Sequence, residues 1–136
     1  MKIPNGWKPY EFGKAVSFNP KVKFQKGEQY TFIEMDDVNA DDKFATGKGK
    51  RIFTTGSCSK FRNNDVLFAR ITPCLDNKKI ATAAIGENEV GFGSTEFIIL
   101  RAKENVTVQE YVHYLSKSEY IIQNAINSYV GASGRQ

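Results

Sequence analysis

The chain of 136 residues has few of the side chains on which catalysis, metal binding and disulfide scaffolds depend. It holds one His, two Cys and four Pro. Cys58 and Cys74 lack the CxxC spacing of a zinc or redox site, so we interpret them as reduced, incidental thiols. No run approaches the roughly 18 consecutive apolar residues of a membrane span, and residues 1–10 lack the apolar segment of a signal peptide. We therefore expect a cytoplasmic protein with no membrane partner.

Motifs for metal and nucleotide binding are incomplete. Residues 37–48 begin with the spacing of a calcium loop, but its sixth position is Asp42 instead of Gly and its twelfth is Lys48 instead of Glu. Gly91-Phe92-Gly93 is followed by Glu96 where a dinucleotide fingerprint requires Gly, so we predict a tight turn there. His113 is the only candidate imidazole base, and we interpret it as a helix-surface or hydrogen-bonded core residue. These patterns predict no metal, no cofactor and no catalytic activity of its own.

Positive charge is concentrated in the first half of the chain. Residues 1–68 carry 12 Lys+Arg against 8 Asp+Glu, whereas residues 69–136 carry 7 of each. One stretch of this half has no acidic residue, and its cations are interspersed with short hydroxyl side chains. They are Lys43, Lys48, Lys50, Arg51, Lys60 and Arg62, with Thr54, Thr55 and Ser57 between them. Such residues can neutralise phosphates and hydrogen-bond base edges, although a solvated basic surface has the same composition.

Hydrophobic patterning predicts strands first and helices last. Residues 29–35 alternate, residues 66–69 are an apolar run after an Asn-Asn-Asp turn signal, and residues 50–55, 80–85 and 95–101 have strand composition. Arg70 follows the apolar run, so we expect it at the rim of a sheet within reach of a ligand. The order favours an α+β fold with a mixed or antiparallel sheet instead of a doubly wound one.

Helical periodicity begins near residue 107. Val108, Tyr111, Val112 and Leu115 follow the i, i+3, i+4, i+7 pattern, and Thr107 with Glu110 matches a capping box. A second helical stripe opens near residue 118 and closes at residue 131. We therefore expect two C-terminal helices.

Five segments carry a resemblance to the specificity subunits of type I restriction-modification systems. Their order and spacing make the match specific, since each alone is weak. They are residues 4–7 (PNGW), 32–38 (FIEMDDV), 65–75 (DVLFARITPCL), 93–101 (GSTEFIILR) and 131–136 (GASGRQ).

The resemblance implies that residues 1–136 form a single DNA target recognition domain. Such a domain reads one half of a bipartite site in double-stranded DNA for an adenine methyltransferase subunit and a restriction/translocase subunit, and performs no chemistry. A complete subunit has two such domains and two spacer helices. This chain has one domain and neither helix, so we expect a truncated product. Asn19-Pro20 is followed by Lys21, which departs from the [DN]PP[YF] motif of the methyltransferase itself.

Two hypotheses about mechanism follow, and a third is kept as an alternative. In the first, Lys43, Lys48, Lys50 and Lys60 contact phosphates while Arg51 or Arg62 contacts guanine. In the second, the C-terminal helices form a protein-interaction module that docks a methyltransferase subunit through Tyr111, Leu115, Ile122 and Tyr129. A nuclease would need a metal held by the acidic residues 36–42.

Overall fold

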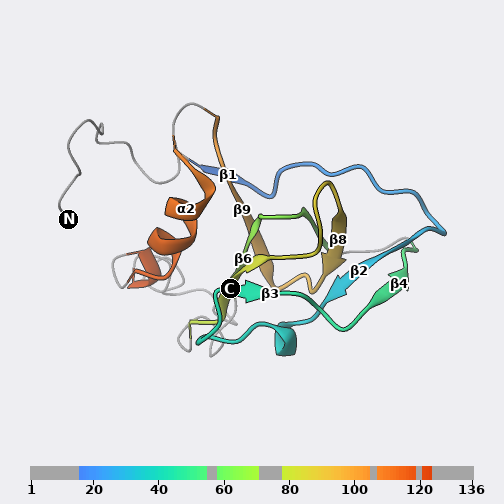
Figure 1. Cartoon of the computed structure of the whole chain (residues 1–136), viewed down its shortest axis with the longest axis horizontal. Helices are drawn as coiled ribbons and strands as arrows, with labels where there is room; N and C mark the ends of the chain where they lie inside the picture. The colour runs from blue at the N-terminus through green and yellow to red at the C-terminus, as the bar shows by residue number, and fades with distance from the viewer. Residues whose placement is uncertain (1–15, 55–57, 71–77, 105–106, 119–120, 124–136) are drawn as a thin grey trace, which may run out of the picture.

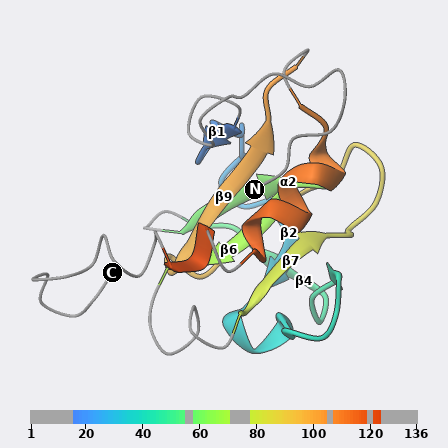
Figure 2. The same cartoon turned by 90° about the vertical axis from the view of Figure 1, so that its left-hand side faces the viewer.

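The structure, a computed structural model, describes residues 16–54, 58–70, 78–104, 107–118 and 121–123. These residues form three layers, with helix α2 (Gln109–Ser116) outside, a five-stranded sheet in the middle and a four-stranded sheet on the far side (Figure 1). Figure 2 shows α2 lying across β9, β6 and β7. Within these ranges no helix has the length and apolar character needed to cross a membrane.

Both sheets are mixed, as the α+β interpretation predicts. The five-stranded sheet has the order β1-β9-β6-β7-β3, with β1 (Val16–Phe18), β9 (Phe97–Ala102), β6 (Val66–Ala69), β7 (Ile80–Ala83) and β3 (Phe44–Ala45). The four-stranded sheet has the order β4-β2-β8-β5, with β4 (Lys50–Ile52), β2 (Gln29–Ile33), β8 (Val90–Gly93) and β5 (Ser59–Arg62). The pairs β2–β8 and β3–β7 are parallel, and the other pairs are antiparallel.

Two hydrophobic cores separate the three layers. One lies between the five-stranded sheet and the helices and includes Phe68, Leu100, Val112 and Ile122. The other lies between the sheets and includes Ile33, Phe61, Leu67, Phe97 and Ile99. Burying each large side chain stabilises the fold by about 1.5 to 3 kcal/mol. Because β6 is covered on both faces, all four of its residues are apolar and buried, which explains its uninterrupted hydrophobic run.

Most strands that the sequence predicts are confirmed, with shorter bounds. β2 matches the alternating segment from residue 29, with Thr31 and Ile33 buried and Tyr30 and Phe32 on the opposite face. The predicted turn at residues 63–64 precedes β6.

The turn predicted at Gly91-Phe92-Gly93 is wrong, because these residues belong to strand β8. Glycine is required there by close packing. A Cβ atom on Gly91 would lie 2.7 Å from the Phe61 ring and 2.8 Å from the Thr31 carbonyl oxygen. One on Gly93 would overlap the carbonyl oxygen of Ile33. Strand β8 therefore fits between β2 and β5 only without side chains at these two positions.

The capping box predicted for the first C-terminal helix is also wrong. Helix α2 begins at Gln109 after Val108, and its N-cap forms no side-chain hydrogen bond. The hydroxyl of Thr107 is buried without a hydrogen-bond partner in the described residues. Glu110 instead accepts a hydrogen bond from Lys43. Of the second predicted helix the structure describes residues 121–123, which are helical.

Asp65, the last residue of the predicted Asn-Asn-Asp turn, is buried with a relative exposure of 1%. Its carboxylate accepts hydrogen bonds from the side chain of Arg101 and from the backbone of Arg62. The ion pair with Arg101 explains the burial, because a carboxylate can leave water when a guanidinium and a backbone N–H group satisfy it.

Candidate nucleic-acid interface

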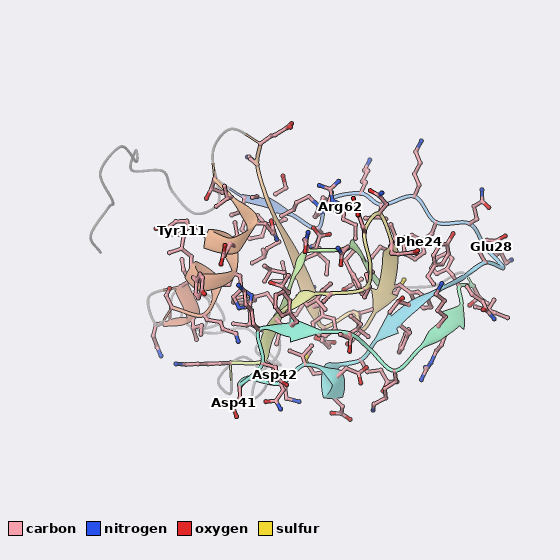
Figure 3. All side chains as sticks on the ribbon, viewed as in Figure 1. Phe24, Glu28, Asp41, Asp42, Arg62 and Tyr111 are labelled. Carbon is pink, nitrogen blue, oxygen red and sulfur yellow. The ribbon has the colours of Figure 1, made fainter. Side chains whose placement is uncertain are left out.

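The outer face of the four-stranded sheet, turned away from the inter-sheet core, carries a row of aromatic rings. Phe32 of β2 and Phe92 of β8 lie side by side, with ring centroids 5.0 Å apart. Phe53 packs 5.5 Å from Phe92, and Phe24 packs 5.0 Å from Phe53 and 4.3 Å from Tyr30. Phe24 lies at the β8 and β2 end of the molecule, opposite Tyr111 on α2 (Figure 3).

A cation lies against each end of this aromatic row. The guanidinium carbon of Arg51 on β4 is 4.2 Å from the Phe32 centroid. The ammonium of Lys60 on β5 is 5.1 Å from the Phe53 centroid and 5.7 Å from that of Phe24. Ring faces attract cations by about 0.5 to 1 kcal/mol at exposed sites. The rings therefore hold two cationic groups at the outer surface of the sheet.

Lys60 also lines a groove of about 740 Å³ between β5 and the extended segment that follows β1. We call it the basic groove and define it by its cations Lys21, Lys23, Lys60 and Arg70. Asn19, Ser59 and Thr95 add polar groups to its lining, which contains no carboxylate among the described residues. None of the four cations forms an ion pair with another described residue. Unpaired positive charge along a groove favours an extended anion.

The wall of the basic groove is tied to the sheets at both ends. Asn19 donates its backbone N–H to the carbonyl oxygen of Ile99 at 2.7 Å, and its Oδ1 accepts the N–H of Ile99 at 2.9 Å. Phe24 fixes the other end by packing into the aromatic row, and the hydroxyl of Tyr30 accepts the N–H of Gln25 at 2.9 Å. The lysines between these ties therefore project from a braced segment of backbone.

The structure places the predicted DNA-contacting residues in several separate locations. Lys60 and Arg70 meet in the basic groove. Lys43 lies at the opposite side of the five-stranded sheet, where it pairs with Glu110 of α2 at 3.3 Å. Lys48 pairs with Asp37 at 3.5 Å.

The remaining predicted residues lie around β4 and β5. Lys50 and Arg51 are exposed on edge strand β4, with Arg51 3.3 Å from Glu34. Arg62 is exposed at the end of β5 and lines a second hollow with Glu87 and Glu89. Thr54 is exposed after β4. Thr55 and Ser57 lie outside the described residues.

Sequence reasoning missed Lys21 and Lys23. They alternate with Val22 and Phe24, whose side chains are half-buried while the lysines are exposed. This period of two is the signal that could have found them, because it predicts an extended segment with one apolar and one cationic face. The segment pairs with no strand among the described residues.

Burial raises the pKa of the Cys58 thiol in the basic groove, and the positive charge of Lys60 opposes this shift. The thiol is therefore protonated at neutral pH, which makes it a poor nucleophile and a poor metal ligand. Among the described residues, no three His, Cys, Asp or Glu side chains are grouped so as to hold a metal ion.

His113 is buried in the core behind α2, with a relative exposure of 2%. Its Nδ1 lies 2.7 Å from the hydroxyl of Thr82. Burial lowers its pKa from 6.5 to about 4, and the positive charges of Lys117 and Lys43 act in the same direction while Glu110 opposes them. Of the two roles expected for His113, on the helix surface or hydrogen-bonded in the core, the structure shows the second.

The helical stripe suggested as a docking surface is partly covered. Ile122 is buried in the core between the five-stranded sheet and the helices, and Tyr111 and Leu115 are half-buried. Tyr129 lies outside the described residues. Val108 and Tyr114 are the large apolar residues that α2 and its N-cap expose, so the exposed surface differs from the predicted one.

Comparison with solved structures defines the class of this fold. The chain aligns over 99% of its length with a structure from work on complex assembly and conformational transition of the type I R-M system, with a TM-score of 0.74 and 18% identity. It aligns over 90% with the crystal structure of the HsdS subunit from Thermoanaerobacter tengcongensis, with a TM-score of 0.52 and 18% identity. The chain therefore has a fold like that of the HsdS subunit.

Curated relatives agree with this class. The chain is 26% identical over 141 residues to the type I restriction enzyme EcoAI specificity subunit of Escherichia coli, and 24% identical to the EcoEI specificity subunit. Both alignments cover the whole chain but only 24% and 23% of those subunits, and the two solved chains are covered to 35% and 33%. No protein-family model matches the chain.

Proposed function

We propose that residues 1–136 form one target recognition domain that binds double-stranded DNA and reads one half of a bipartite site. The observation that carries the proposal is the basic groove, in which four cations without described carboxylate partners lie along a braced wall. Phosphates are the anions that such a groove suits, because lysine and arginine release the counterions condensed on DNA. The sequence likeness to specificity subunits supports the choice of DNA over other polyanions.

In this function the domain performs no chemistry. It serves as the specificity component for an adenine methyltransferase subunit and a restriction/translocase subunit, which act on the DNA that it selects. The likeness to type I restriction proteins supports these partners. The predicted contacts outside the groove, at Lys43, Lys48, Lys50 and Thr54, form a wider alternative interface, which the Lys43→Gln variant tests.

The test is the salt dependence of duplex binding, measured by fluorescence anisotropy with the full chain at low ionic strength. If the four groove cations contact phosphates, the slope of log K against log salt is about −3.6. Lys60→Gln removes one contact and reduces the slope by about 0.9. Lys43→Gln is the matched control, because it removes the same charge on the far side of the five-stranded sheet.

Each result decides a separate point. A slope reduced by Lys60→Gln but not by Lys43→Gln supports an interface centred on the basic groove. A slope reduced equally by both variants extends the interface to the predicted wider set. Salt-independent binding, or a wild-type slope for the folded Lys60→Gln variant, rejects the groove as the DNA site.

A further inference from the structure

Reading a guanine requires more than positive charge. A guanidinium donates two N–H groups side by side to O6 and N7 of guanine, so its plane must be oriented before the DNA arrives and its N–H edge must remain open. Three arginines outside the masked segments are candidates on the surface or rims of the sheets. They are Arg51, Arg62 and Arg70.

Arg51 has the orientation that this contact requires. Its guanidinium lies over the Phe32 ring, with its central carbon 4.2 Å from the ring centroid. Nη2 donates to Oε1 of Glu34 at 3.3 Å. The ring contacts the flat face of the group and the carboxylate holds one corner, while 61% of the side chain stays exposed on the edge strand. Other N–H donors in the guanidinium plane therefore remain available to a ligand.

Arg62 lies in a different electrostatic environment. It lines a hollow of about 520 Å³ together with Glu87, Glu89 and the Asp65–Arg101 pair. The two glutamates are exposed and, unlike Glu34 with Arg51, form no ion pair with the arginine beside them among the described residues, so their charge repels the phosphates that flank any base. No aromatic ring stacks on Arg62 among the described residues. Arg70 lines the basic groove, so in the proposed function it contacts phosphate.

The distance between Arg51 and the basic groove fits the dimensions of DNA. Arg51 is on β4 and Lys60 on β5, at opposite edges of the four-stranded sheet, with β2 and β8 between them. Three steps of about 4.8 Å across the strands, with a register offset of two residues along them, give about 16 Å. The major groove is about 12 Å wide, so a backbone held in the basic groove brings base edges within reach of Arg51.

We propose that Arg51, positioned by Phe32 and Glu34, is the residue through which this chain selects a guanine. The proposal rests on the proposed function and deepens it, because it separates the side chain that selects sequence from the groove that supplies affinity. Phe32 and Glu34 are positioning residues in this scheme, since they orient the guanidinium without contacting DNA.

The experiment selects duplexes from a random pool with the full chain at low salt and sequences those that stay bound. The variants are Arg51→Lys and the matched Arg62→Lys, both of which keep the charge and lose the planar fork. Arg51→Lys is expected to lower the preference for guanine at one position by about 10- to 100-fold, with an unchanged salt slope. Arg62→Lys is expected to keep the wild-type preference.

A further variant tests the positioning role. Phe32→Leu removes the ring beneath the guanidinium, so the guanine preference is expected to fall while the salt slope stays at the wild-type value. Thermal melting of each variant checks that it is folded. If Phe32→Leu lowers the melting temperature and leaves the preference intact in the folded protein, the ring has a structural role only and the positioning scheme is rejected.

The outcomes separate this proposal from the proposed function. If the wild-type chain selects a sequence and Arg51→Lys selects the same one, Arg51 is not the reader although DNA binding stands. If Arg62→Lys alone loses the preference, the assignment passes to Arg62. If the wild-type chain binds duplex DNA without any sequence preference, the role of Arg51 is overturned while the phosphate contacts of the basic groove remain. Absence of duplex binding overturns both.

Discussion

Arg101 and Asp65 form a bidentate ion pair that joins β9 to the turn before β6. Nε and Nη2 of Arg101 donate to the two carboxylate oxygens of Asp65, each at 2.7 Å. The Asp65 side chain is almost fully buried, and its backbone carbonyl accepts the N–H of Ala83. The pair therefore connects three strands of the five-stranded sheet at one point.

Removing one partner of this pair is expected to destabilise the protein. Arg101→Met leaves a carboxylate buried without its cation, which lowers the free energy of unfolding by about 3 to 5 kcal/mol. Urea denaturation measures the loss. The double variant Asp65→Asn with Arg101→Met is expected to lose less than the sum of the two single variants, because it removes both charges. Additive losses would show that the two side chains do not interact.

The buried imidazole of His113 is expected to make the fold sensitive to mild acid. Its folded pKa is about 4 against 6.5 when unfolded, so between these values the unfolded chain binds a proton that the folded chain does not. Stability is therefore full above pH 6.5 and falls as the pH is lowered towards 4, by about 2 to 3 kcal/mol.

This pH dependence can be measured directly because the chain has one histidine. The imidazole NMR signal is expected to titrate near pH 4. The control His113→Asn keeps an acceptor facing Thr82 but has no proton to gain, so its unfolding free energy should lose this component of the pH dependence. A signal that titrates near 6.5 would contradict the neutral, buried imidazole.

The two glycines of β8 are expected to tolerate substitution to different degrees. Gly93→Ala places a methyl group against the backbone carbonyl of Ile33, which cannot move without breaking the β2–β8 pairing. Gly91→Ala meets the Phe61 ring, which can shift in part, and the carbonyl oxygen of Thr31 at 2.8 Å, a longer contact than the overlap at Gly93. Both are expected to be destabilising by about 1 to 3 kcal/mol or more, with Gly93→Ala the worse.

Thermal or urea unfolding ranks these variants. Gly27→Ala serves as the control, because a Cβ there meets no atom within 4 Å and only its positive φ of 92° is strained. Losses at Gly91 and Gly93 no larger than the loss at Gly27 would contradict the packing explanation, because neither glycine of β8 has a positive φ.

The tie between Asn19 and Ile99 is expected to support both stability and the basic groove. Asn19 has a φ of 48°, in the left-handed region, and its Oδ1 accepts the N–H of Ile99. Asn19→Gly keeps access to this conformation but loses the acceptor, so it is expected to be destabilising by about 1 to 3 kcal/mol. Asn19→Ala also strains the backbone and should cost more.

Affinity for duplex DNA, measured on the same variants below their melting temperatures, tests the link to function. A looser wall lowers affinity without changing any charge, so the salt slope should remain that of the wild type. Unchanged affinity in Asn19→Gly would show that the groove does not depend on this tie.

The sequence predicts elements whose signals are local. The apolar run of β6 follows an Asn-Asn turn, and β2 alternates buried and exposed residues, so both are recognisable within a few residues. Strand β8 was missed because its glycines have the composition of a turn. Only the position of Phe61 and the carbonyl of Ile33 reveals why glycine is needed there.

The candidate site was harder to predict because its parts are distant in sequence. Lys60 and Arg70 were recognised from their local context, but Lys21 and Lys23 join them only through the packing of their segment on β9 and the aromatic row. Conversely, Lys43 is near Lys48 in sequence and was grouped with it, although its partner is Glu110 on α2. The spacing of charged residues in the sequence therefore did not predict how they are grouped on the surface.

The bond between Asn19 and Ile99 joins residues separated by 80 positions. Because translation proceeds from the N-terminus, the segment with the groove lysines is synthesised before β9, the strand to which it is hydrogen-bonded. Nascent fragments that stop before β9 have the lysines but no groove to hold them. In the proposed function, binding of duplex DNA therefore requires synthesis of the chain through β9.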